Sequence, residues 1–342
     1  MSILALDIGG ANLKAADGRG YAACRPFELW KQPDGLRQAL VELIAGAPPS
    51  EEIVATMTGE LADCFATKSD GVRAIVAACQ SAAAGRRIGF YRTDGTFAPP
   101  EVACHQPMLA AAANWHALAT FAGRFVEQGC GLLLDIGSTT ADIVPLQEGR
   151  PAAGGVNDPE RLAAGELVYT GVRRSPVCAV VSTLPWRGRP CPVAQELFAT
   201  TWDTYLLLKE LPPEPNRRDT ADCRPATIEA AHDRLARMIC ADRELFDRAD
   251  AHAAAETIQK AQLAKLGVAA RNVISRMPES PRAVVLCGEG EFLAHKLIDR
   301  LRLNVRRISL SEELGRHVSR AATAHALAVI AREHGQQDTQ VE

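Results

Sequence analysis

Two stretches of this chain carry the same pattern, an apolar strand that ends in Asp-Ile-Gly. The run Ile3–Leu6 leads into Asp7-Ile8-Gly9, and the run Leu132–Leu134 leads into Asp135-Ile136-Gly137. Short apolar runs that end at a glycine are typical of buried strands followed by tight turns. One such pattern is common, but two matching copies, each at the start of a half of the chain, predict an internal duplication.

Small polar residues follow both glycines and give each turn the chemistry of a phosphate-binding loop. Glycine lets the backbone approach an anion closely, while hydroxyl and backbone N–H groups donate hydrogen bonds to it. Asp7 and Asp135, at the matching strand ends, are expected to converge on one hydrated Mg²⁺ beside the phosphates. The candidate phosphate ligands of the two loops are Gly9, Gly10, Asn12, Lys14, Gly137, Ser138, Thr139 and Thr140.

The paired loops resemble the phosphate-1 and phosphate-2 loops of the actin, Hsp70 and sugar-kinase superfamily. The resemblance implies an α/β fold in which two ribonuclease-H-like domains face each other across a cleft. It also implies a third glycine loop near a nucleoside, and the segment 284–290, which contains Gly288 and Gly290, fits that place. The expected domains are residues 1–128 and 129–342, with a largely helical insertion in the second that covers approximately residues 155–280.

The composition restricts the partners that such a protein can have. The chain has 342 residues, enough for two domains, and its net charge of −3 without a basic patch argues against nucleic acid. No apolar run approaches the length of a membrane span. Because Met1 leads directly into a core strand and the ten cysteines form no Cys-x-x-Cys pair, we expect a reduced cytoplasmic protein without a signal peptide.

Helical spacing predicts helices at Leu36–Ile44, Gly71–Ala84 and Met108–Val126, and another over residues 318–329. The last two are rich in alanine, and small residues let two helices cross closely. In the superfamily that the loops resemble, two such helices form the hinge between the domains. A plain pair of core helices would use the same residues, so only their positions relative to the loops favour a hinge.

The segment Met57–Asp63 follows a strand expected at residues 53–57 and carries two acidic residues after its glycine. Glu60 and Asp63 would lie in the first turn of whatever follows, where acidic side chains are favoured by the helix dipole. Alternatively, both face the cleft and act as a base or a metal partner. The local sequence favours neither reading over the other.

Three segments resemble one branch of a larger family more specifically. They are Met57–Asp63, Gly165–Pro176, and Asp219–Thr227 running into Arg234–Met238. All three are similar to hydantoinase/oxoprolinase-like proteins of the tetrahydromethanopterin-linked one-carbon pathway, whose archaeal members make the aryl ether of methanofuran. Cys223 is a departure, because glycine is expected at this loop position.

This resemblance implies a transferase of methanofuran or methylofuran biosynthesis. It would condense an aminomethylfuran-methyl diphosphate with the phenol of a (glutamyl-)tyramine or tyrosine, forming an aryl ether and releasing diphosphate. Mg²⁺ and Lys14 would stabilise the departing charge, and Glu60 with Asp63 would assist removal of the phenolic proton. The acceptor's carboxylates would meet Arg173, Arg174 or Arg224, although a solvated surface charge is the commoner explanation for any single arginine.

Other classes of protein fit the same loops. An ATP-dependent small-molecule kinase or ATPase would hold adenosine at Gly288-Glu289-Gly290, and a regulator would bind nucleotide without turnover. ATP is therefore a candidate ligand that the transferase reading does not require. The expected partners are small-molecule diphosphates and phenols, not nucleic acid or a membrane, and a homodimer is left open.

Overall fold

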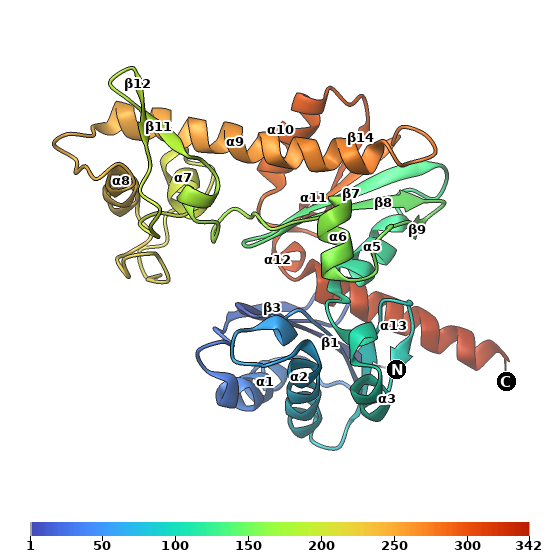
Figure 1. Cartoon of the computed structure of the whole chain (residues 1–342). Helices are drawn as coiled ribbons and strands as arrows, with labels where there is room; N and C mark the ends of the chain where they lie inside the picture. The colour runs from blue at the N-terminus through green and yellow to red at the C-terminus, as the bar shows by residue number, and fades with distance from the viewer. Residues whose placement is uncertain (1, 342) are drawn as a thin grey trace.

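The computed structural model describes residues 2–341 and places them in two lobes, with a third body extending from the second lobe (Figure 1). The first lobe contains a six-stranded sheet in the order β3-β2-β1-β4-β5-β6. Within it, β1 runs antiparallel to β2 and parallel to β4, which in turn runs parallel to β5. The strands are β1 (Ile3–Ile8), β2 (Asn12–Ala16), β3 (Ala22–Pro26), β4 (Glu52–Met57), β5 (Arg87–Tyr91) and β6 (Phe97–Ala98).

The second lobe contains a sheet in the order β10-β8-β7-β13-β14, with β9 paired to β8 beside this path. Here β7 runs antiparallel to β8 and parallel to β13, which runs parallel to β14. The strands are β7 (Cys130–Ile136), β8 (Ala141–Gln147), β9 (Arg150–Pro151), β10 (Leu167–Val168), β13 (Ala283–Cys287) and β14 (Arg306–Ser309).

The two sheets repeat one topology. In each, an N-terminal hairpin supplies the central strand and its antiparallel neighbour, and strands that arrive later extend the other side in parallel. The third strand of the second copy is divided between β9 and β10, which pair with opposite ends of β8. The predicted duplication is therefore confirmed, as is the actin/Hsp70/sugar-kinase type of fold with its two ribonuclease-H-like domains.

Helices cover both faces of the first sheet. One face packs on α1 (Leu36–Ala45) and α2 (Lys68–Ala83), whose apolar side chains join those of the strands in a single core. Both helices occur where helical spacing predicts them. Alanine and leucine side chains of α13 (Ala322–Val341) cover the other face, where they contact β1, β2 and β4.

Two helices cross between the lobes, and each packs on the sheet of the other half of the chain. The helix α5 (Asn114–Gly123) packs on β8 and β9, whereas α13 packs on the first sheet. The two helices also contact each other, with Ala119, Ala122 and Ala326 in one shared core (Figure 1). The expected crossing of two alanine-rich helices between the lobes is thus present, and their role as a hinge stays a prediction. The division at residues 128 and 129 stays a prediction, because packing crosses it in both directions.

The prediction of one continuous helix over Met108–Val126 is wrong. The structure has α3 (Pro100–His105), α4 (Pro107–Ala110) and then α5. Between α4 and α5, Ala112 adopts a left-handed conformation with φ of 49°, which ends a right-handed helix despite the high helix propensity of alanine. The helix expected over residues 318–329 is likewise divided, into α12 (Arg316–Ser319) and α13.

The insertion is held to the second lobe by its longest helix. The C-terminal half of α9 packs on the second sheet, and its N-terminal half packs in a separate core formed by the third body (Figure 1). The expected polar loop before this region contains a short helix, α6. The elements are α6 (Asp158–Ala164), η3 (Val177–Ala179), β11 (Thr183–Trp186), β12 (Arg189–Pro192), α7 (Thr201–Leu207), α8 (Ile228–Arg237) and α9 (Arg248–Ile274).

The remaining helical elements are short or lie beside the second sheet. They are η1 (Pro33–Gly35), η2 (Gly59–Leu61), α10 (Glu291–Leu301) and α11 (Leu310–Glu313). Across residues 2–341, no helix combines the length and the apolar character needed to span a bilayer.

The close approach of α2 to the preceding segment makes a testable prediction. A Cβ at Gly71 would lie 2.2 Å from the carbonyl oxygen of Glu60, a backbone atom with little room to move. Alanine normally stabilises a helix by about 1 kcal/mol relative to glycine. We expect Gly71→Ala instead to lower the free energy of unfolding by about 1–3 kcal/mol in denaturant titrations, because overpacking outweighs propensity.

Gly267 in α9 provides the matched control. A Cβ there would lie 3.5 Å or more from its neighbours, the nearest being the end of the Arg271 side chain. Gly267→Ala should therefore raise the free energy of unfolding by up to about 1 kcal/mol. An increase in stability for both variants would contradict the described packing of α2.

Candidate functional site

The hairpin turns of the two lobes are closed by the same hydrogen bond. The N–H of Gly9 donates to the carbonyl of Asn12 at 3.0 Å, and the N–H of Gly137 donates to the carbonyl of Thr140 at 2.9 Å. The two loops that the sequence pairs are therefore alike in backbone structure as well as in pattern.

The side chains opposite the two aspartates carry opposite charges. In the first hairpin Asp7 lies opposite Lys14, and their side chains form an ion pair at 3.3 Å. Burial of Lys14 disfavours its charge, but Asp7, followed by Cys24 and Asp135, more than offsets this and raises the pKa of Lys14. The first loop therefore presents a permanent cation.

The second hairpin places Asp135 opposite another acid, Asp142. Burial raises the pKa of Asp135 to about 7, and the nearby charge of Asp142 contributes, whereas Lys14 opposes the shift. Asp135 is therefore partly protonated near neutral pH. A cation bound beside it would favour the ionised form.

A backbone segment from the insertion supports the second loop. The N–H groups of Arg173 and Arg174 both donate to the carbonyl of Ser138 at 3.0 Å. At Gly171 this segment lies directly against the second loop, because a Cβ at that position would lie 2.4 Å from the backbone nitrogen of Thr139. This contact requires glycine at position 171 and fixes both arginines relative to the loop.

A buried polar network holds the same segment to α7 and α9. The side-chain amide of Gln262 donates to the hydroxyl of Thr170 and the carbonyl of Gly171, both at 2.9 Å. Its carbonyl oxygen accepts from the hydroxyl of Tyr205 at 2.5 Å. Since buried hydrogen-bonded networks specify one arrangement, they keep the second loop in register with the insertion.

The third glycine loop rests directly on the end of β7. Gly288 has φ of +88°, and a Cβ there would lie 2.3 Å from the carbonyl oxygen of Ile136. The N–H of Gly290 donates to the same carbonyl at 2.8 Å. Glycine is therefore required at position 288 by both conformation and space.

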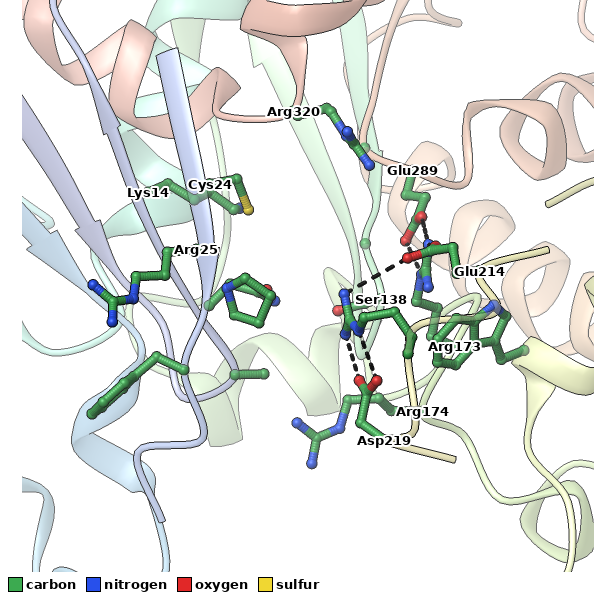
Figure 2. Close-up of a pocket in the computed structure, with 18 of the residues that line it drawn as sticks. Lys14, Cys24, Arg25, Ser138, Arg173, Arg174, Glu214, Asp219, Glu289 and Arg320 are labelled. Atoms are coloured by element: carbon green, nitrogen blue, oxygen red, sulfur yellow. Dashed lines mark hydrogen bonds and ion pairs between the residues drawn. The ribbon is translucent and has the colours of Figure 1, made fainter. Parts of the chain in front are cut away.

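A cavity of about 1560 Å³ lies between the two lobes and the insertion (Figure 2). Its volume exceeds the range of about 300–1,000 Å³ that is usual for a single small ligand. The expected site residues that line it are Asn12, Lys14, Asp135, Gly137, Ser138, Arg173, Arg174 and Gly288. The two Asp-Ile-Gly loops and the third loop thus face one common space.

Other predicted site residues do not line the cavity. Glu60 is 1% exposed and one of its carboxylate oxygens, Oε2, has no hydrogen-bond partner among the described residues, while Asp63 is exposed. Arg224 pairs with Asp233 at 2.9 Å away from the wall. The remaining residues of this kind are Asp7, Gly9, Gly10, Thr139, Thr140 and Gly290, which belong to the loops but not to the cavity surface.

Arg173 is engaged by the protein itself. Its guanidinium pairs with Glu214 at 2.5 Å and with Glu289, and it stacks on the ring of Trp202 at 4.2 Å (Figure 2). Burial disfavours its charge, but the hydrogen bonds from Arg173 to these glutamates outweigh burial and raise the pKa of Arg173. Arg173 therefore ties the third loop to the insertion.

Several cavity residues escaped the sequence analysis. They come from the segment after β3, from α7 and the loop that follows it, and from α12 and the residue after it. They include Trp30, Trp202, Arg217, Asp219, Arg316 and Arg320. The segment that begins at Asp219 has a family-like sequence, which was a usable signal. Trp30 and Arg320 carry no local pattern, because only the meeting of the lobes brings them to the cavity.

The residues present fit a hydrated magnesium ion to a limited extent. No group of three or more His, Cys, Asp or Glu side chains within the described part of the chain could hold a metal. Mg²⁺, however, usually binds through one or two carboxylates, several waters and the phosphates of a substrate. Asp135 lines the cavity and fits that role, whereas Asp7 is already paired with Lys14. The magnesium site stays a prediction.

Cys223 occupies a position that favours glycine. Its φ of 57° lies in the left-handed region, which explains why the resemblance leads one to expect glycine there. The side chain of Asp222 accepts from the N–H of Arg224 at 3.1 Å and thereby stabilises this turn.

Comparison with known proteins agrees with the class that the topology defines. The solved structure of a PilM–PilN type IV pilus biogenesis complex is similar over 96% of this chain and 98% of that chain, with a TM-score of 0.51 and 14% identity, which shows a shared fold. Fold and loops define a protein of the actin, Hsp70 and sugar-kinase class. The profile of the hydantoinase/oxoprolinase family matches residues 51–334, and the chain belongs to that family.

Two curated relatives carry the same name. The chain is 31% identical over 330 residues, 95% of its length and 96% of the relative's, to a (4-{4-[2-(gamma-L-glutamylamino)ethyl]phenoxymethyl}furan-2-yl)methanamine synthase from Methanocaldococcus jannaschii. The relative from Methanococcus vannielii is 33% identical over 124 residues, which are 36% of this chain and 55% of that protein. The first match extends over nearly the whole of both chains.

The burial of Glu60 predicts a pH-dependent contribution to stability. Burial raises the pKa of Glu60 to about 7, against opposing hydrogen bonds from the backbone and the charge of Lys68. The folded state therefore binds this proton more tightly than the unfolded state, so the contribution of Glu60 to stability falls as pH rises from about 4.5 to 7. We expect Glu60→Gln to become progressively more stable relative to the unsubstituted protein over that interval, by thermal unfolding.

Asp63→Asn is the matched control for this measurement. Asp63 lies three residues further along the same segment and is exposed, so its substitution should leave the difference in melting temperature independent of pH. A constant difference for Glu60→Gln would contradict the raised pKa and the burial that causes it.

Proposed function

We propose that this protein forms an aryl ether, joining a furan-methyl diphosphate to the phenol of a glutamyl-tyramine or tyrosine acceptor and releasing diphosphate. The observation that carries the proposal is the near full-length match to a synthase whose named product contains a phenoxymethyl-furan linkage. The segments that resemble this branch also contribute to the cavity, through Arg173, Arg174 and Asp219. This activity would serve methanofuran or methylofuran biosynthesis.

The cavity suits two substrates at once. Its phosphate end has the loops, Lys14 and Arg320, which directly follows α12 and lines the same wall. Burial raises the pKa of Cys24, and the charges of Lys14 and Arg320 oppose this shift, so both cations act on the same part of the cavity. A diphosphate would be bound there by N–H and hydroxyl donors and by two cations. The rest of the volume, bounded by Trp30 and Trp202, would receive the phenolic acceptor.

The chemistry requires one bond to break and one to form. The C–O bond to diphosphate breaks with its electron pair moving to the diphosphate, whose developing charge Lys14 and Arg320 stabilise. The furan ring stabilises the positive carbon, the phenol oxygen bonds to it, and the phenolic proton leaves to a base. Magnesium, when bound at Asp135, would supply further charge stabilisation.

The base that accepts the phenolic proton has two candidates. Glu60 is the sequence-based candidate, and its pKa of about 7 suits the role, but its segment would have to open towards the cavity. Asp135 already lines the cavity and also has a pKa of about 7, but it can act as the base only in an arrangement in which it does not hold the metal ion. In the second arrangement Asp63 takes no part.

The alternative is an ATP-dependent kinase or ATPase that uses the same loops. In that case the nucleoside would lie beside Glu289. Either Glu289 would have to release Arg173, or the adenine ring would have to fit next to the Arg173–Glu289 ion pair.

The direct test supplies the full chain with an aminomethylfuran-methyl diphosphate and γ-glutamyl-tyramine, with Mg²⁺ and without ATP. We expect release of diphosphate in equal amount with an ether product identified by mass spectrometry. A strict requirement for ATP, or tight ATP binding without ether formation, would support the kinase alternative.

Asp135→Asn tests the metal and phosphate end. We expect turnover to fall by at least about 100-fold, because the carboxylate that would hold magnesium beside the leaving group is lost. The fold should persist by circular dichroism, since asparagine has nearly the same size as aspartate and burial already disfavours the charge of Asp135 by raising its pKa. Near-normal turnover at limiting Mg²⁺ would refute this role.

A further inference from the structure

The arginines that line the cavity differ in whether the protein neutralises them. Arg25 pairs with Glu42, Arg217 pairs with Asp219 at 2.5 Å, and Arg173 is held by two glutamates. Arg174, Arg316 and Arg320 have no carboxylate partner among the described side chains. An unpaired cation on a cavity wall can bind an anionic group of a ligand without first losing a partner.

Position separates Arg174 from the other two unpaired arginines. Arg316 begins α12 and Arg320 follows its last residue, and Arg320 acts on Cys24, which lies opposite Lys14 in the first sheet. In the view of Figure 2, Lys14 and Arg320 lie at the upper edge of the pocket and Arg174 at the lower edge. The side chain of Arg174 is thus placed away from Lys14 and Arg320, the two cations of the phosphate end.

The side chain and backbone of Arg174 are both fixed. Its guanidinium stacks on Trp30 of the first lobe, 4.4 Å from the ring centroid, while its N–H donates to the carbonyl of Ser138. Stacking engages the flat face of a guanidinium and leaves its five N–H donors at the edge. Arg174 therefore presents a preorganised donor edge at a defined place relative to the phosphate loop.

Asp219 lies near Arg174 at the lower edge of the pocket in Figure 2 and carries a negative charge. Asp219 accepts two hydrogen bonds from Arg217, at 2.8 and 2.5 Å, and both residues line the cavity (Figure 2). Burial opposes ionisation of Asp219, but these hydrogen bonds outweigh it and lower its pKa. This part of the wall offers one unpaired cation, Arg174, and an ionised carboxylate that is shared with Arg217. The oxygens of Asp219 can accept further hydrogen bonds beside that pair, so the two residues complement a zwitterion.

We propose that Arg174 and Asp219 bind the free α-amino acid group of the acceptor, with its carboxylate on Arg174 and its ammonium on Asp219. The inference rests on the proposed function. A γ-glutamyl amide is linked through its side-chain carboxyl, so its α-carboxylate and α-ammonium both stay free. These two residues set acceptor specificity and do not touch the reacting oxygen, whereas Trp30 orients Arg174.

The test compares acceptors that differ only in the amino acid group. We expect Arg174→Gln to reduce kcat/KM for γ-glutamyl-tyramine by about 10- to 100-fold, as for loss of a charged hydrogen bond. The loss should lie in KM with kcat nearly unchanged, because the contact is remote from the chemistry. For tyramine, which lacks the α-carboxylate, we expect the variant and the unsubstituted protein to agree within about threefold.

Substrate analogues and matched variants assign the two charges. With the unsubstituted protein, the α-methyl ester of γ-glutamyl-tyramine should reproduce the effect of Arg174→Gln. The N-acetyl derivative of the same acceptor should reproduce the effect of removing the Asp219 carboxylate. Arg174→Lys should recover part of the affinity. Arg218→Gln, in the same loop as Asp219 but off the cavity wall, should leave both acceptors unaffected. Tyrosine, the other proposed acceptor, also carries an α-amino acid group. If tyrosine is the natural acceptor, its kcat/KM should likewise fall in Arg174→Gln.

Three outcomes separate this inference from the proposed function on which it rests. If the unsubstituted protein forms ether but Arg174→Gln keeps its preference for γ-glutamyl-tyramine over tyramine, the inference is wrong and the function stands. An equal loss with both acceptors would also refute it, since Arg174 would then act on the phenol or the diphosphate. If the unsubstituted protein forms ether with no acceptor, the proposed function itself fails.

Discussion

The carbonyl of Ser138 accepts hydrogen bonds from both Arg173 and Arg174, and the candidate site depends on this contact. It can form only because Gly171 has no side chain. Through it, the phosphate loop of the second lobe is joined to the buried network of the insertion. Through Arg173, it is also joined to Glu289 in the third glycine loop. The contact at this one backbone oxygen thus connects parts of the chain that are far apart in sequence.

The duplicated lobes share one hairpin backbone but differ in the charge that lies opposite the aspartate of the Asp-Ile-Gly pattern. The first hairpin places Lys14 beside its aspartate, whereas the second places Asp142 there, which itself is paired with buried Arg161 at 2.8 Å. As a result the first lobe supplies a permanent cation and the second supplies a carboxyl group that titrates near neutrality. A site that must bind an anion and assist its departure benefits from both.

The insertion changes what a two-lobed phosphate site can accept. Its long helix α9 anchors a third body to the second sheet, and the insertion as a whole contributes Trp202, Arg217 and Asp219 to the cavity. The phosphate loops alone would define only where an anion lies. The added wall provides aromatic surface and paired charges for a second substrate, which is what a condensation reaction requires. Family membership and geometry are therefore complementary arguments for the proposed transferase.

The sequence by itself determined the duplicated hairpins, the three glycine loops and the type of fold. These features are local, since a glycine turn after a buried strand depends on neighbouring residues and hardly on distant ones. Only the tertiary structure decided which charges are available to a ligand. Arg173, Arg174 and Arg224 look equivalent in sequence. In the folded protein Arg173 pairs with the distant Glu289 and Arg224 pairs with Asp233, whereas Arg174 has neither kind of partner among the described residues. Glu60 is buried for the same kind of reason, because its environment is made by helices that pack from elsewhere in the chain.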